Sequence, residues 1–109
     1  MIAVAVNTSE KRGQLLLVKD NQVLAESFWE GTTSHSEVIT KEFNSLLSKT
    51  SFDTEAISEI FCVIGPGSFT GLRVGVSFSK TLAYINNTPI QTINSLDLLV
   101  LNCKKQDRQ

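Results

Sequence analysis

The chain has 109 residues, of which 41% are hydrophobic and 19% charged, and its formal net charge is −1. This length suits one globular domain, and the charge argues against a lobe that binds nucleic acid by itself, because phosphate binding usually needs a basic surface. No apolar run reaches the roughly 20 residues that span a bilayer, and residues 1–6 lack a basic leader. We therefore expect a cytoplasmic protein that does not contact membranes.

The first part of the chain predicts an antiparallel meander followed by a helix. Three apolar runs have the length and composition of strands, and residues 20–22 between the second and third are typical of a tight turn. Apolar residues at helical spacing from Ser36 onward predict a helix, and the polar stretch at 48–54 predicts a linker. The three predicted strands cover residues 2–6, 14–19 and 23–29.

The second part of the chain alternates strands and helices. A strand at 60–64 precedes a glycine-rich helix, a short strand at 89–93 follows it, and Ser95 can cap a closing helix that runs to Leu101. The order βββαβαβα predicts an α/β fold with a mixed five-stranded sheet and helices. We expect one lobe over residues 1–103 and a polar tail at 104–109.

The most informative motif is the glycine-rich turn GPGSFTGLRVG at residues 65–75. Gly65 and Gly67 permit backbone angles that other residues disfavour, and Ser68 or Thr70 can cap the following helix, whose N–H groups could then face an anion. A P-loop is excluded because Leu72-Arg73 follows the last glycine of the turn, and the dinucleotide fingerprint fails because its third glycine comes one residue late. A tight structural turn and an anion site both remain open.

Small residues recur every four positions on the predicted glycine-rich helix, at Gly71, Gly75 and Ser79. Each glycine inside a helix costs about 1 kcal/mol relative to alanine, so the stripe predicts close packing by another segment. That segment is either the protein's own sheet or first helix, or a partner protein. Both alternatives remain open.

The glycine-rich motif resembles the signature of the TsaB (YeaZ) family, whose members are needed to make threonylcarbamoyladenosine in tRNA. Asn7-Thr8-Ser9 resembles the family's Asp-Thr-Ser, Ser34-His35-Ser36 resembles the start of its first helix, and Asn94-Ser95-Leu96 resembles the entry to its third helix. The resemblance covers residues 1–103 and implies the ribonuclease-H-like lobe of the actin-like ATPase superfamily. Family members usually have two such lobes, so we expect this chain to be the N-terminal one.

The resemblance also implies a function: a noncatalytic scaffold that binds a TsaD-type enzyme and self-associates as a homodimer through its helices. A TsaE-type ATPase would be reached through that complex. Arg73 either pairs with a carboxylate of a partner or covers apolar surface with its stem. The expected interface residues are His35, Ile39, Phe43, Gly71, Leu72, Gly75 and Ser79.

Catalysis by this lobe is not expected. Asn7 stands where the family has an aspartate, and an amide lacks the charge with which a carboxylate helps to hold a metal. His35 is the only histidine, so a histidine pair for a metal cannot form within one chain, and we expect no metal and no cofactor. This also counts against the glycopeptidase label that related proteins have carried.

The alternative function is an ATP- or phosphate-binding enzyme lobe that uses magnesium. It would place the phosphates between the end of the first strand and the glycine-rich turn. Its candidate phosphate-binding residues are Asn7, Thr8, Ser9, Gly65, Gly67 and Ser68.

Overall fold

A computed structural model of the chain describes residues 2–9, 12–20, 22–30, 35–65 and 69–94. The elements follow the predicted order as far as the fifth strand. The predicted closing helix and polar tail lie outside the described residues. The elements are β1 (Ile2–Asn7), β2 (Gly13–Lys19), β3 (Gln22–Trp29), α1 (His35–Ser48), a 3-10 turn η1 (Thr54–Ala56), β4 (Ile57–Val63), α2 (Phe69–Asn86) and β5 (Ile90–Ile93).

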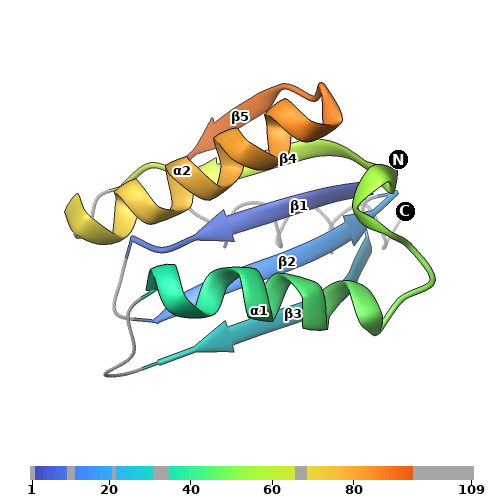
Figure 1. Cartoon of the computed structure of the whole chain (residues 1–109), viewed down its shortest axis with the longest axis horizontal. Helices are drawn as coiled ribbons and strands as arrows, with labels where there is room; N and C mark the ends of the chain where they lie inside the picture. Colours follow the sequence, from blue (N-terminus) through green and yellow to red (C-terminus); the bar gives the residue numbers. More distant parts are fainter. Residues whose placement is uncertain (1, 10–11, 21, 31–34, 66–68, 95–109) are drawn as a thin grey trace.

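The five strands form one mixed sheet in the order β3-β2-β1-β4-β5. β1, β2 and β3 are antiparallel neighbours, whereas β4 runs parallel to β1 and β5 runs parallel to β4. The two α-helices lie side by side over the same face of the sheet and run in the same direction, both beginning at the end where β1 ends (Figure 1). The predicted fold class, a mixed five-stranded α/β lobe, is confirmed.

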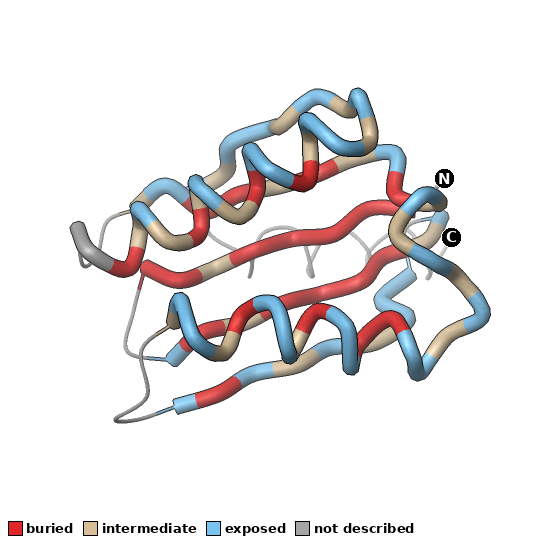
Figure 2. The backbone as a smooth tube through the Cα atoms, viewed as in Figure 1, coloured by how far each residue is buried: buried red, intermediate tan, exposed pale blue. Residues whose placement is uncertain are grey.

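The central strands β1 and β2 are apolar over most of their length because both faces of the sheet are buried there (Figure 2). One face packs with the helices into the larger core, which includes Val4, Leu15 and Ile60. The other face carries a smaller buried cluster that includes Ala5, Leu16 and Val63. This burial on two sides explains why β1 and β2 read as continuous apolar runs rather than alternating patterns.

The predicted boundaries differ from the structure mainly at β4. The strand begins at Ile57, which pairs with Ile2 of β1, and the 3-10 turn η1 begins at Thr54, the last residue of the predicted linker. Residues 57–59 fall between the predicted linker, which ends at Thr54, and the predicted strand, which begins at Ile60, and the polar Ser58 and Glu59 interrupt the apolar run there. Ile64, predicted to end the strand, lies beyond it and is exposed, although its N–H still donates to the carbonyl of Ile93 at 3.1 Å.

Candidate functional site

The polar residues at the end of β1 and directly after it form hydrogen bonds within the protein. The Asn7 Oδ1 accepts hydrogen bonds from the Ser9 backbone N–H at 3.0 Å and from the Ser9 hydroxyl at 2.6 Å. The Thr8 hydroxyl donates to the carbonyl oxygen of Gly71, and both Thr8 and Ser9 are buried. These side chains close a local turn and join the end of β1 to α2, so the Asn7 oxygen and the Thr8 and Ser9 hydroxyls already form hydrogen bonds within the fold.

The turn between β4 and α2 begins with a backbone conformation that favours glycine. Gly65 has φ 135°, which lies in the left-handed region that side chains disfavour. The predicted backbone role of this glycine is confirmed. Gly67 and Ser68 lie outside the described residues, so phosphate binding by the turn stays a prediction.

The stripe of small residues on α2 packs against the protein's own sheet and the residue that follows β1. A Cβ at Gly71 would lie 2.1 Å from the carbonyl oxygen of Thr8, and one at Gly75 would lie 2.5 Å from the Thr8 Oγ1. Ser79 is fully buried. This placement favours the internal alternative and corrects the expectation that Gly71, Gly75 and Ser79 face a partner. Thr8, the residue after β1, already covers the two glycines, and Ser79 lies beside Cys62 of β4.

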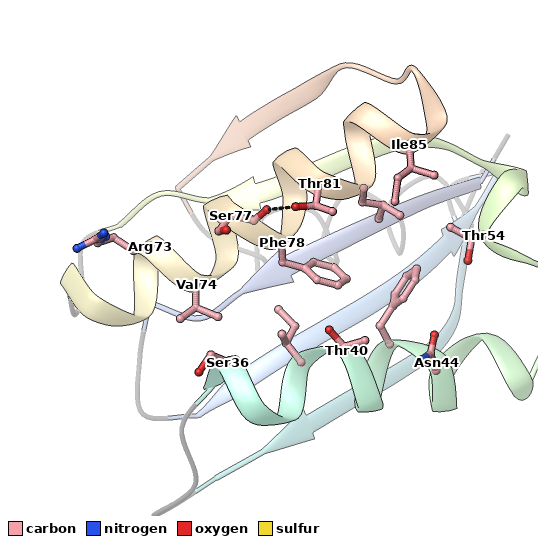
Figure 3. Close-up of a pocket in the computed structure, with 13 residues that line it drawn as sticks. Ser36, Thr40, Asn44, Thr54, Arg73, Val74, Ser77, Phe78, Thr81 and Ile85 are labelled. Carbon is pink, nitrogen blue, oxygen red and sulfur yellow. Dashed lines mark hydrogen bonds between the residues drawn. The ribbon is translucent and has the colours of Figure 1, made fainter.

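A groove of about 700 Å³ runs between α1 and α2 on the side of the helices away from this stripe (Figure 3). Its floor is apolar: Ile39 and Phe43 come from α1, and Phe78 of α2 meets the Phe43 ring edge-on with the ring centroids 5.3 Å apart. Ile85 lines the groove near the end of α2 and is 66% exposed. The groove therefore leaves apolar side chains in contact with water.

Polar side chains at four-residue intervals form the two rims of this groove. Residues spaced in this way lie on one face of a helix, one turn above another. Among the described lining residues Arg73 is the only charged one, so the site is apolar and largely uncharged. The rims consist of Ser36, Thr40 and Asn44 on α1 and of Arg73, Ser77 and Thr81 on α2.

Only part of the predicted interface set lines the groove. Ile39 and Phe43 lie in its floor, whereas Leu72 is half-buried elsewhere on α2 and His35 lies at the start of α1, outside the lining. The set omitted four groove residues of α2 that recur at intervals of four and three positions, a spacing typical of helix-packing faces. These omitted residues are Val74, Phe78, Thr81 and Ile85.

Side-chain hydrogen bonds fix both helices on the sheet. The Asn86 amide at the end of α2 donates to the carbonyl of Thr54 at 2.6 Å and to that of Ile57 at 3.2 Å. In α1, Glu42 accepts from the hydroxyl of Ser27 on β3 at 2.5 Å. Together with the bond from Thr8 to Gly71, these contacts hold the walls of the groove at a set separation.

The described residues hold no cluster of three or more His, Cys, Asp or Glu side chains that could bind a metal. Cys62 is buried, and this burial raises the pKa of its thiol, an effect that the neighbouring Ser79 hydroxyl partly offsets. A thiol that favours its protonated form is a poor nucleophile. Within the described ranges, neither helix has both the length and the apolar character needed to cross a membrane.

Residues 22–109 match the model of the family described as "TsaD: tRNA N6-adenosine threonylcarbamoyltransferase". The chain is 33% identical over 107 residues to the tRNA threonylcarbamoyladenosine biosynthesis protein TsaB of Bacillus subtilis, a match that covers 98% of the chain and 47% of that relative. It is 32% identical to a tRNA N6-adenosine threonylcarbamoyltransferase of Fervidobacterium nodosum, over 88% of the chain and 33% of the relative.

The solved structures agree with the fold. YeaZ from Pseudomonas aeruginosa gives a TM-score of 0.79 at 23% identity, covering 88% of this chain and 46% of that one. A further Pseudomonas aeruginosa structure, described as similar to the peptidase YEAZ, gives 0.80 at 22% identity, covering 87% and 44%. The fold and the family model thus define a lobe of the TsaD type.

Within that class, the chain belongs to the TsaB (YeaZ) family. It spans about half the length of the TsaB relative and of the two Pseudomonas aeruginosa structures.

Proposed function

We propose that this chain is a noncatalytic subunit in the synthesis of threonylcarbamoyladenosine in tRNA, and that the groove between α1 and α2 binds a TsaD-type protein. The name of the Bacillus subtilis relative supports the pathway. The observation that carries the binding role is the groove itself, in which Val74, Phe78 and Ile85 remain partly or largely exposed.

The chemistry of the groove suits a helix of the partner. An apolar floor with uncharged polar rims matches the way an amphipathic helix buries its apolar face in a groove and leaves its edges to polar contacts. Because hydrogen bonds already hold α1 and α2 on the sheet, little ordering of the surface is needed on binding, which favours affinity. A second copy of the chain would compete for the same surface, so homodimer and heterodimer exclude one another in this proposal.

The noncatalytic part of the proposal rests on the end of β1. Asn7 offers an amide oxygen that already accepts two hydrogen bonds from Ser9, and the Thr8 hydroxyl is directed to Gly71. The alternative, an ATP- or phosphate-binding lobe, has weaker support because these side chains would have to exchange internal bonds for ligand bonds. Calorimetry with ATP and magnesium separates the two, since the scaffold proposal expects no heat of binding.

The test of the groove compares two neighbouring exposed residues at the end of α2. Ile85 lines the groove and is 66% exposed, whereas Tyr84 is 89% exposed and does not line it. We expect Ile85→Glu to weaken binding to the TsaD-type protein of the same organism at least about tenfold, equivalent to about 1.4 kcal/mol, because it puts a charge against an apolar partner surface. Tyr84→Glu adds the same charge one residue away and should change binding less than about twofold.

Calorimetric titration gives the affinities, and circular dichroism checks that both variants are folded. Light scattering of the chain alone measures self-association in the same two variants. Equal binding by Ile85→Glu and the unmodified chain would remove the groove from the proposal, and a larger effect of Tyr84→Glu would move the interface to the outer face of α2.

A further inference from the structure

Strand β3 forms one edge of the sheet, and among the described residues it pairs only with β2 (Figure 1). An edge strand turns the N–H and C=O groups of alternate residues away from the sheet, where they can pair with a further strand. β3 also leaves apolar side chains in contact with water, since Leu24 is 40% exposed and Phe28 is 50% exposed. The outer edge of β3 is therefore a candidate surface for strand pairing.

A bulge limits how much of this edge can pair. The register between β2 and β3 shifts at Leu24, which faces no residue of β2, whereas the ladder is regular from Ala25 to Trp29. Bulges interrupt pairing and bend a strand, and native proteins use them to protect edges. The part of β3 that can accept a second strand is therefore the segment 25–29.

The side chains of this segment alternate between the two faces of the sheet. Glu26 lies opposite Leu16, which belongs to the core on the face away from α1 and α2. Phe28 shares that face because it is two residues further along the strand. Ser27 points to the other face, where its hydroxyl donates to Glu42 of α1 at 2.5 Å. An exposed carboxylate and an exposed aromatic ring are thus neighbours on the face away from the two helices.

A positive charge lies beside the exposed ring. The Arg12 guanidinium carbon is 4.3 Å from the centroid of the Phe28 ring. The Arg12 side chain is 53% exposed, and its ion pair with Glu30 is long, at 3.9 Å between the Nε and the Oε1. An exposed pair of this kind is weak, so Arg12 can also meet a second carboxylate. The edge therefore carries a positive group at Phe28 and a negative group, Glu26, two residues before it.

These charges are complementary to themselves in one register. A two-fold axis perpendicular to the sheet pairs β3 of two copies antiparallel and places the same residue of each copy at the axis. With Glu26 at the axis, two carboxylates lie directly opposite each other, which is unfavourable. With Ala25 at the axis, the bulge enters the ladder. With Ser27 at the axis, Glu26 of each copy lies opposite Phe28 of the other, where the Arg12 guanidinium already stands.

We propose that two copies of the chain pair antiparallel through the β3 edge about Ser27, with Arg12 of each copy bound to Glu26 of the other. The paired segments are short, so the contact is smaller than a standard interface and the dimer is weak and transient. A second copy in the groove would exclude a partner there, whereas pairing through β3 leaves the groove open. Each copy can then hold its own TsaD-type protein, and only this consequence rests on the function proposed above.

One group opposes this pairing on the helix face. Glu42 accepts a hydrogen bond from Ser27, so the axis brings the two Glu42 carboxylates toward each other. Glu42→Gln keeps an oxygen acceptor for the Ser27 hydroxyl and removes the charge. It should therefore strengthen the dimer by about twofold, and a weaker dimer in this variant would contradict the register.

The test measures the mass of the full chain by sedimentation equilibrium over a range of concentrations. We expect a monomer–dimer equilibrium with a dissociation constant in the tens of micromolar. Glu26→Arg and Arg12→Glu each set like charges against one another twice, and each should weaken the dimer about tenfold. An equimolar mixture of the two variants should dimerise like the unmodified chain, because opposite charges then meet at both positions. Glu55→Arg, in the exposed part of η1, is the matched control and should leave the dimer unchanged.

Circular dichroism checks that the variants are folded. A chain that stays monomeric up to about 1 mM overturns the pairing, and so does a mixture that dimerises no better than its two components. Loss of the dimer in Ile85→Glu, with no effect of either charge reversal, assigns self-association to the groove and likewise overturns it. Absence of binding to the TsaD-type protein contradicts the proposed function instead, while the mass of the chain alone still decides the pairing.

Discussion

Two faces of α2 have similar residue spacing but different surroundings. On one face, Gly71, Gly75 and Ser79 recur every four residues and pack closely against the sheet and Thr8. On the next face, Val74 and Phe78 have the same spacing but border an open groove. The periodicity of a helix shows which residues share a face, but the size of the side chains decides how closely the neighbouring segment approaches.

The largest effect is expected from adding one methyl group to the face of α2 that packs against the sheet. Gly71→Ala should destabilise the fold by about 3 kcal/mol, because the new Cβ would lie 2.1 Å from the backbone oxygen of Thr8, which cannot turn aside as a side chain can. Urea unfolding measures the loss. Ser77→Ala, on the exposed side of the same helix, is the matched control and should change the free energy of unfolding by less than about 0.5 kcal/mol. Unchanged stability of Gly71→Ala would contradict the close packing of α2 on β1.

A smaller effect is expected from removing a hydrogen bond on the same packed face of α2. Thr8→Val keeps the shape of the side chain but removes the hydroxyl that donates to the Gly71 carbonyl, and should cost about 1–2 kcal/mol. Thr8→Ser keeps the donor and separates loss of the bond from loss of the methyl group. If the valine variant is as stable as the serine variant in thermal unfolding, the bond contributes nothing to the contact between β1 and α2.

The smallest effect is expected at Ser79, with the opposite sign. Its buried hydroxyl has no hydrogen-bond partner among the described residues apart from the neighbouring Cys62 thiol, which is a weak one. Ser79→Ala should therefore leave stability unchanged or raise it by up to about 1 kcal/mol. The same change should raise the pKa of the Cys62 thiol further, which slows alkylation at alkaline pH. A loss of more than about 1 kcal/mol would mean that the hydroxyl has a bonding role.

The sequence predicted the elements well because their patterns are local. The apolar run at 2–6 and the helical spacing after Ser36 follow from burial on one or two faces, which each segment shows by itself. The start of β4 could not be read in this way, because Ile57 is held in the sheet by its pairing with Ile2, far away in the chain. A pairing between distant segments leaves little trace in the composition of either one.

The candidate site was predicted only in part for a related reason. The sequence showed that Gly71 and Gly75 need a close neighbour, but not whether that neighbour is β1 or another protein. The groove residues Val74, Phe78 and Ile85 look like ordinary core residues in sequence, and only the placement of α1 beside α2 shows that they remain accessible. The hydrogen bond between Trp29 and His35 joins two side chains that meet only in the folded chain.

The bonds of Asn86 have a consequence for how the molecule opens. This side chain joins the last residue of α2 to the carbonyls of Thr54 and Ile57, which lie 32 and 29 residues earlier in the chain. Helix ends usually fray first, because their last carbonyls and side chains have few partners. Here the end of α2 cannot unwind without also releasing the entry to β4, so the helix and the strand before it open together as one cooperative unit.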